Sequence, residues 1–219
     1  MGMMGYDWCD QLVHVPYGTV SIGGEKLATR TGNVILLRDL FGTAIEKVTA
    51  LVEEKNPDLP DKEAACEAVG VGAVIFHYLY NSRIKDINFI MEDALSFEGN
   101  TGPYAQYTYA RTRSILEKAP AADKTAAPKI TASEEADVLK AISRFPEKVL
   151  SALEDYEPSV ITRYIIELAT AFNRFYHNCP IISAEDEAVK NTRLRITEAV
   201  GIIIKKALAL ICMKAPEKI

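Results

Sequence analysis

The sequence predicts a mainly α-helical protein in which a helical bundle follows a short segment of mixed β and α structure. Runs rich in valine and isoleucine and bounded by glycine or proline, which are typical of strands, occur within residues 10–37. Beyond them, apolar residues recur at steps of three to five, the spacing of one helix face. In the second half, Pro146, Pro158 and Pro180 separate segments of helical length, as expected for a bundle.

The mixed segment is expected to begin with two short strands and a helix. We place the strands in residues 11–24 (QLVHVPYGTVSIGG) and 33–37 (NVILL), so that a glycine-flanked loop lies between them. A helical period covers residues 38–55 and directs one apolar face toward the core. The residues of that face are Leu40, Ile45, Val48 and Val52.

A second helix is predicted after the sequence NPDLPDKE breaks the first. Pro60 or Asp61 can open it, and it continues through residues 64–83. Gly70 and Gly72 lie inside its apolar run, so we expect another helix to approach closely there.

The third helix has a clear start. Residues 98–102 form a turn, Thr101 can cap the helix, and Pro103 lies in the first turn, where proline is favoured. The helix should end before Pro120. Residues 118–131 (KAPAADKTAAPKIT) lack apolar periodicity and predict a loop.

Four further helices are predicted to complete the bundle. They cover residues 133–145, 146–156, 158–178 and 186–213. In the third of these, Phe172 continues the apolar series of Ile161, Ile165 and Leu168, so we expect it in the core.

Composition indicates a globular protein that acts away from membranes. Of its 219 residues, 48% are hydrophobic, which is enough for a core. No stretch reaches the roughly 18–20 apolar residues of a membrane helix, and MGMMGYDWCD lacks the basic start and apolar centre of a signal peptide. We therefore expect a soluble, cytoplasmic protein. The scattered cysteines are expected to be reduced and buried; they are Cys9, Cys66, Cys179 and Cys212.

Charge and ligand spacing exclude two kinds of site. A net charge of −5 argues against a large positively charged surface that binds the phosphates of nucleic acid. Any RNA binding should therefore be local and shape-specific. Cys179 and His177 are close in sequence, but a metal site needs three or four ligands. We expect no metal site.

Residues 23–33, GGEKLATRTGN, form a basic loop with glycines at both ends. The spacing is not that of a P-loop, because no G-x-x-x-x-G-K-[ST] sequence occurs. Lys26, Arg30 and the hydroxyls of Thr29 and Thr31 could hold a polyphosphate. Taken alone, the loop favours the simpler interpretation of a solvated turn that carries ordinary charges.

A series of six ordered segments resembles one family, the arginyl-tRNA synthetases. GTVSIGGEKLATRTGNVILLRDL resembles the KMSKS loop, the second signature of class I aminoacyl-tRNA synthetases, in the arginyl variant. The long string DALSFEGNTGPYAQYTYARTRSIL is the most specific of the others, which are VGVGAVIFHYL, ATAFNRFYHNCPIISAE, TRLRITEAV and KAPEKI. The resemblance covers essentially the whole chain. It implies the end of a class I catalytic domain over residues 1–98 and a helical anticodon-binding domain over residues 99–219.

The resemblance also implies which loop residues act on ATP. In the family this loop stabilises the charge that builds on the ATP phosphates during amino acid activation. Lys26 matches the first lysine of the signature, and Arg30, or a basic group outside this chain, would have to supply the charge that the loop lacks, so Lys26 and Arg30 are the expected catalytic residues. The expected ATP loop comprises Lys26, Leu27, Ala28, Thr29 and Arg30. Thr29 stands where the signature has its second lysine, which leaves the loop short of positive charge.

The family's other signature, HIGH, has no counterpart in these 219 residues. Half an active site loses the proximity and orientation of both substrates, so we expect the isolated chain to be inactive. ATP with magnesium is expected in the intact enzyme, with no cofactor bound to this fragment. Arginine and ATP would be held through the catalytic half.

Two clusters fit recognition of a single-stranded anticodon, whose bases stack on aromatic rings and guanidinium planes. Tyr104, Tyr107 and Arg111 lie at i, i+3 and i+7 on one stripe of a helix. Asn173 and Tyr176 form a similar cluster on a later helix. The resemblance implies that both segments bind tRNA and that the last residues, ending at Ile219, fold back toward the same pocket.

Structural roles are open for the same residues. Tyr104 could pack its ring inward and satisfy its hydroxyl by a hydrogen bond. Tyr107, Arg111, Asn173 and Tyr176 could equally belong to the structure of the bundle.

The function expected from the whole sequence is a part in arginine–tRNA ligase. The chain would bind the anticodon region of arginine tRNA and contribute its KMSKS-type loop to ATP-dependent aminoacylation. We expect a monomer that binds neither DNA nor membranes. The alternative is a free-standing helical module that binds RNA or protein without catalysis.

Overall fold

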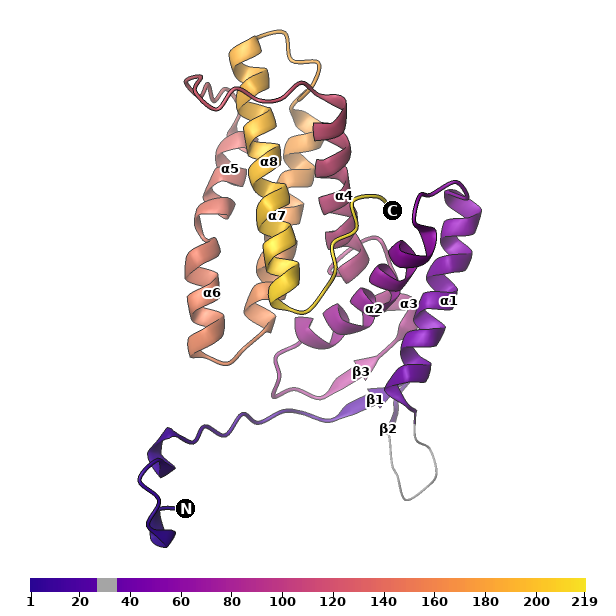
Figure 1. Cartoon of the computed structure of the whole chain (residues 1–219), viewed down its shortest axis with the longest axis vertical. Coiled ribbons are helices and arrows are strands. Elements are labelled where there is room, and N and C mark those ends of the chain that lie inside the picture. The colour runs from indigo at the N-terminus through magenta and orange to yellow at the C-terminus, as the bar shows by residue number, and fades with distance from the viewer. Residues whose placement is uncertain (27–34) are drawn as a thin grey trace.

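The computed structural model describes residues 1–26 and 35–219. Within them the chain is mainly helical, as the sequence predicts, and a short mixed segment precedes a bundle (Figure 1). The helices of the mixed segment are α1 (Leu37–Lys55), α2 (Lys62–Tyr80) and α3 (Met91–Ala94). Those of the bundle are α4 (Gly102–Lys118), α5 (Ser133–Ser143), α6 (Phe145–Glu154), α7 (Ser159–Asn178) and α8 (Glu187–Leu210).

A small sheet joins β1 (Val20–Ile22), β2 (Glu25–Lys26) and β3 (Ile87–Phe89) in the order β2-β1-β3. β1 and β2 form an antiparallel hairpin in which Ile22 pairs with Glu25. Gly23 and Gly24 make its two-residue turn with φ of 59° and 84°, a conformation that glycine adopts without strain. β3 runs parallel to β1. The first four residues of the predicted basic loop, 23–26, therefore belong to this hairpin, and β2 was not predicted.

The predicted strand at 33–37 is wrong in its described part. Ile35 and Leu36 are not in a strand, and Leu37 is the first residue of α1. Burial favours the helix, because α1 presents a row of buried side chains at four-residue steps toward α2. The row consists of Leu40, Ala44, Val48 and Val52. β3 was not predicted, since three residues are too few to show an alternating pattern.

Helices α1 and α2 pack closely because α2 carries glycine at the contact. A Cβ atom on Gly70 would lie 2.8 Å from the backbone nitrogen of Ile45 in α1. A Cβ atom on Gly72 would lie 2.8 Å from Gln106 of α4 and from Met213. The expectation of close helix packing at both glycines is confirmed.

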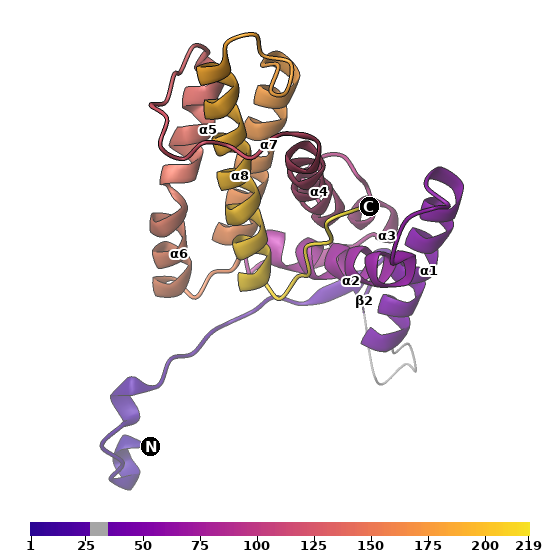
Figure 2. The same cartoon turned by 45° about the horizontal axis from the view of Figure 1, so that its top comes forward.

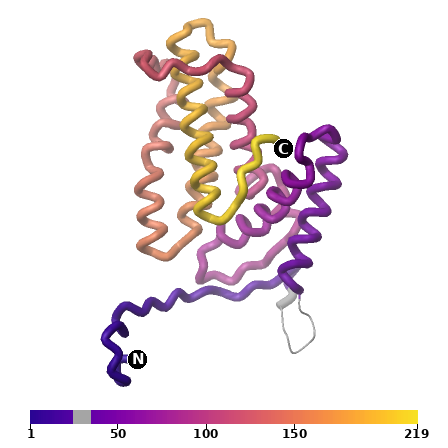
Figure 3. The backbone as a smooth tube through the Cα atoms, viewed as in Figure 1, coloured from indigo at the N-terminus to yellow at the C-terminus, as the bar shows by residue number. Residues whose placement is uncertain are grey.

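The bundle stands beside this mixed segment, and the N-terminal arm extends away from both (Figures 1 and 2). Thr101 caps α4 as predicted: its side-chain oxygen accepts a hydrogen bond from the Tyr104 nitrogen at 3.2 Å, and Pro103 lies in the first turn. Phe172 is fully buried in the bundle core, which confirms its predicted place. After α8 the chain reverses and returns between the bundle and α1 (Figure 3).

All four cysteines are free thiols, but they are not all buried as expected. Cys66 and Cys179 are buried, whereas Cys9 is half-buried and Cys212, which follows the end of α8 with φ of 61°, is exposed. No helix among the described residues is long and apolar enough to cross a bilayer.

Candidate nucleic-acid interface

A cavity of about 770 Å³ lies where the bundle meets the connection between α1 and α2. The face of α4 that includes Tyr107, Ala110 and Arg111 forms one wall. Tyr176 near the end of α7 and the following residues Pro180–Ser183 form a second. Asn56, Leu59 and Pro60 line the α1–α2 side, and Glu217, Lys218 and Ile219 close the cavity from the C-terminal segment. Four segments distant in sequence thus converge on one site.

Arg111 lies against two tyrosine rings in this cavity. Its guanidinium carbon is 4.9 Å from the ring centroid of Tyr107, one helical turn earlier on α4. It is also 4.9 Å from the ring centroid of Tyr176 on α7. Both distances are within the range of cation–π attraction. The guanidinium therefore holds together two aromatic rings that come from different helices.

The two rings remain accessible to a ligand. Tyr107 is 42% exposed and Tyr176 is 39% exposed, unlike the fully buried aromatic residues of the bundle core. Phe97 contacts Tyr107 edge-on, with ring centroids 6.4 Å apart, and so fixes that ring from the α3–α4 connection. Positioned rings with accessible surface can stack unpaired bases.

Asn173 links the same group to the interior of the bundle. Its side-chain oxygen accepts a hydrogen bond from Arg111, and its nitrogen donates to the Tyr104 hydroxyl at 2.9 Å and to Thr108 Oγ1 at 3.1 Å. Tyr104 and Asn173 are not among the described residues that line the cavity. The structure therefore places these two predicted residues behind Arg111, where they orient it.

Ile219 lies on the opposite side of the cavity and packs against the core of the α1–α2 segment. Asn56 Nδ2 lies 3.5 Å from its backbone oxygen, at the limit of a hydrogen bond. Of the predicted RNA-binding residues, the structure brings Tyr107, Arg111, Tyr176 and Ile219 into one cavity.

The charges around the cavity nearly cancel. Its described lining includes Arg111, Lys118 and Lys218, together with Glu117 and Glu217. Lys218 Nζ lies 3.3 Å from a Glu117 carboxylate oxygen, and Glu217 forms a similar pair with Arg113 at 3.5 Å. The site therefore offers little net positive charge for phosphates, and its affinity for RNA would depend on bases.

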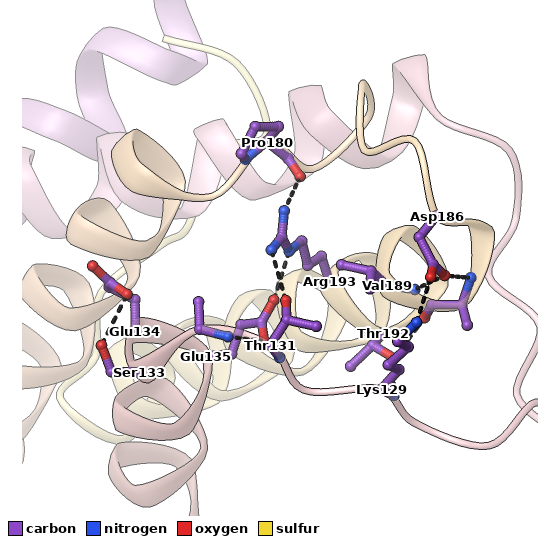
Figure 4. A network of polar contacts seen from close by, with 12 residues as sticks. Lys129, Thr131, Ser133, Glu134, Glu135, Pro180, Asp186, Val189, Thr192 and Arg193 are labelled. Carbon is purple, nitrogen blue, oxygen red and sulfur yellow. Dashed lines mark hydrogen bonds and ion pairs between the residues drawn. The ribbon is translucent and has the colours of Figure 1, made fainter.

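A buried ion pair supports the wall formed by the residues after α7 (Figure 4). Arg193 of α8 donates through Nε to Glu135 Oε1 at 2.6 Å and through Nη1 to the carbonyl oxygen of Pro180 at 2.6 Å. The other Glu135 oxygen accepts from the backbone nitrogens of Thr131 and Ala132, at 2.6 and 3.0 Å. This network fixes the chain immediately before Ile181–Ser183, which line the cavity.

The environment of Glu135 shifts its titration. Burial by itself raises the pKa of this carboxyl, but hydrogen bonds from the Ala132 nitrogen, Arg193 and the Thr131 nitrogen, together with the charge of Arg193, outweigh it. The net result is a pKa below its ordinary value. Glu135 therefore stays ionised at neutral pH in the folded protein and remains paired with Arg193.

The catalytic predictions can be located only in part. Lys26 is the last residue of β2, at the end of the hairpin. Leu27, Ala28, Thr29 and Arg30 lie outside the described residues. In residues 1–26 and 35–219 no group of three or more His, Cys, Asp or Glu side chains could hold a metal ion.

The sequence analysis did not identify Gln106 as a functional residue. Gln106 does not line the cavity, but its side chain donates a hydrogen bond to Lys214 in the C-terminal segment that closes the cavity. It is fully buried on α4, among the small and apolar residues Gly102, Ala105 and Tyr109. A glutamine on a buried helix face was the signal that could have identified it, because such a side chain needs polar partners.

The chain is similar to two families along its length. Residues 105–219 match the family described as DALR anticodon binding domain. Residues 1–91 match the family described as tRNA synthetases class I (R), catalytic domain.

Curated relatives agree with these matches. The chain is 46% identical to arginine–tRNA ligase of Halothermothrix orenii over 218 residues, covering 99% of this chain and 38% of that protein. It is also 46% identical to arginine–tRNA ligase of Lactiplantibacillus plantarum over 217 residues, covering 98% of this chain and 38% of that protein. The chain thus spans little more than a third of the length of these relatives.

Solved structures give the same picture. The arginyl-tRNA synthetase of Thermus thermophilus matches with a TM-score of 0.87 at 33% identity, over 94% of this chain and 35% of that one. The arginyl-tRNA synthetase of Plasmodium falciparum shares the fold, with a TM-score of 0.80 at 23% identity, over 99% of this chain and 38% of that one.

Proposed function

Because this chain belongs to the arginyl-tRNA synthetase family, whose DALR anticodon-binding domain matches its residues 105–219, we propose that it binds the anticodon region of arginine tRNA as part of an arginine–tRNA ligase. The observation that carries this proposal is the convergence of Tyr107, Arg111 and Tyr176 in one cavity. Two accessible rings held by one guanidinium can stack the unpaired bases of an anticodon loop.

The cavity residues divide into two roles under this proposal. Tyr107 and Tyr176 provide stacking surfaces, while Arg111 holds both rings and offers donors to base edges. Tyr104 and Asn173 position Arg111 from behind. Ile219 bounds the cavity from the C-terminal side.

The first part of the chain would act on ATP. The β1–β2 hairpin ends at Lys26, the residue that matches the first lysine of the KMSKS signature. With Arg30 it would stabilise the charge on the phosphates of magnesium-bound ATP, the substrate, as arginine is activated. The loop from Lys26 through Leu27, Ala28 and Thr29 to Arg30 would close over that substrate together with the rest of the catalytic domain.

The domain division and cellular setting belong to the same proposal. Residues 1–98 would complete the catalytic domain, and residues 99–219 would form the anticodon-binding domain. The protein would be a monomer in the cytoplasm, with tRNA as its nucleic-acid partner and neither DNA nor membranes among its ligands. The small net positive charge around the cavity supports a local contact with RNA over a broad contact with phosphates.

Binding of whole tRNA tests this function. The 219-residue chain is titrated into labelled arginine tRNA and, in parallel, into a tRNA for another amino acid, at one fixed salt concentration. The proposal expects tighter binding to arginine tRNA. Equal affinity for the two would overturn it, because the contact would then be independent of the tRNA's identity.

A further inference from the structure

Gln106 does not line the cavity, but its side chain forms two hydrogen bonds to separate segments of the chain. It is fully buried on α4 and its side-chain nitrogen donates to two backbone carbonyl oxygens. One is that of Ala68 on α2, at 2.9 Å, and the other is that of Lys214 in the C-terminal segment, at 2.8 Å. A single amide therefore joins three separate parts of the chain.

The C-terminal segment, residues 211–219, depends on such contacts because it contains no helix or strand. Met213 is buried against the bundle core, and Gly72 leaves the space in which Met213 and Gln106 meet. Beyond Lys214 the described polar contacts are exposed or longer: the Glu217 and Lys218 ion pairs are exposed, and the Tyr109 hydroxyl donates to Glu217 Oε1 at 3.4 Å. The hydrogen bond to the Lys214 carbonyl, at 2.8 Å, is thus the shortest described polar contact between residues 214–219 and the rest of the chain.

We propose that Gln106 is a positioning residue for RNA: it holds the C-terminal segment on α2 and α4 so that Glu217, Lys218 and Ile219 close the anticodon cavity. This proposal rests on the proposed function of the cavity. Gln106 does not touch the RNA itself. Without its donor, the Lys214 carbonyl would lose its buried partner, and the segment would have to be ordered again each time RNA binds.

The variant Gln106→Met tests this directly. Methionine keeps the length and flexibility of the side chain but removes both donors. The other amide atom, Oε1, has no hydrogen-bond partner among the described residues, so its loss breaks no described bond. Gly72→Ala, on α2, is the second variant. Its new Cβ atom would lie 2.8 Å from Gln106 Nε2 and would displace the Gln106 amide from its place. It carries the test if Gln106→Met does not fold.

Lys214→Ala is the matched control. It removes the exposed ion pair of Lys214 with Glu67, at 3.5 Å, but leaves the backbone carbonyl that Gln106 binds. Such an exposed pair contributes little, so this variant should behave as the wild type.

Two measurements are made on each folded variant below its unfolding temperature. In Gln106→Met, amide hydrogen exchange should become at least about tenfold faster at Met213, whose backbone nitrogen donates to the Leu208 carbonyl at 2.9 Å, and stay unchanged in α5 and α7. Affinity for an arginine-tRNA anticodon stem-loop should fall about tenfold. Unchanged exchange at Met213 would overturn the anchoring role. Faster exchange with unchanged affinity would overturn the role in RNA binding.

The outcome for the wild type separates this proposal from the proposed function. If the wild-type chain does not bind the stem-loop, the proposed function fails and the RNA role of Gln106 fails with it. If the wild type binds and Gln106→Met binds equally well, the proposed function stands and the positioning role alone is overturned.

Discussion

The guanidinium carbon of Arg111 lies 4.9 Å from the ring centroid of Tyr107, one turn earlier on the same helix, and equally far from that of Tyr176 on α7. Helical spacing alone brings Arg111 near Tyr107. The second ring arrives through the packing of α4 against α7. A local sequence pattern and a tertiary contact together therefore build the candidate base platform.

Substitution of the platform should weaken RNA binding more than folding. Tyr107→Ala and Arg111→Ala should each cost about 1–3 kcal/mol of binding free energy for an anticodon stem-loop, the range for loss of one stacked base. The unfolding temperature of Tyr107→Ala should change little because its ring is 42% exposed. Fluorescence anisotropy and circular dichroism measure the two quantities.

Arg163→Ala is the control for these variants. Its guanidinium carbon lies 6.0 Å from the Tyr80 ring centroid, outside the described cavity lining, so its loss should leave RNA affinity unchanged. A drop of several degrees in the unfolding temperature of Tyr107→Ala, with near-normal affinity in the folded fraction, would assign the ring to structure instead.

The buried ion pair should dominate stability around the cavity wall. Arg193→Met would leave the Glu135 carboxylate buried without its partner, so we expect the free energy of unfolding to fall by about 3–5 kcal/mol. Lys129→Met is the comparison: it removes the exposed ion pair between Lys129 and Asp186, which lies near the buried pair, and should change stability little. Urea denaturation measures the free energy of unfolding of both variants. Equal losses of stability would contradict the claim that the buried pair contributes more than the exposed one.

Stability should also depend on pH through Glu135. Its pKa is lowered in the folded state, so its stabilising contribution is present above the unfolded-state value of about 4.3 and is lost as the pH falls through the lower folded value. The free energy of unfolding should therefore decrease below about pH 5. Glu135→Gln does not titrate and should show a shallower decrease; an unchanged slope would contradict the assignment.

RNA affinity should respond weakly to salt. The described lining has three basic residues, and the carboxylates of Glu117 and Glu217 form ion pairs with basic side chains beside the cavity. Few basic side chains are therefore available to neutralise phosphates. The slope of log affinity against log salt concentration should be no steeper than about −2 for single-stranded contacts. A slope near −5 would indicate a backbone-binding surface elsewhere on the molecule.

Lys26 should affect catalysis more than tRNA binding. In a complete arginine–tRNA ligase that carries this chain, Lys26→Ala should lower the rate of arginine activation more than it raises KM for tRNA, because the charge it offsets develops in the transition state. Lys85→Ala, an exposed lysine on the α2–β3 connection, is the control. The reverse pattern for Lys26→Ala would assign that lysine to tRNA positioning.

The sequence predicted the elements whose signals are local. The start of α4 follows from Thr101 and Pro103, and the core position of Phe172 follows from its apolar series. The strand predicted at Ile35 and Leu36 failed because strand propensity is a weak preference that the adjacent packing of α1 on α2 overrode.

Long-range contacts explain what could not be predicted. Gln106 binds carbonyl groups 38 and 108 residues away, and nothing in its neighbourhood specifies either partner. The placement of Tyr104 and Asn173 behind Arg111 likewise depends on how α4 and α7 face each other. Helical spacing could place Tyr104, Tyr107 and Arg111 on one stripe but could not show which of them reaches the cavity.

Discrimination between anticodons tests the central claim most directly. The 219-residue chain is titrated into two labelled stem-loops that differ only in the anticodon, one from arginine tRNA and one altered, at one fixed salt concentration. We predict weak binding that is clearly tighter for the arginine anticodon, because the contacts proposed for the cavity are with bases and its lining has little net charge. Equal affinity for both stem-loops would contradict anticodon recognition by this cavity.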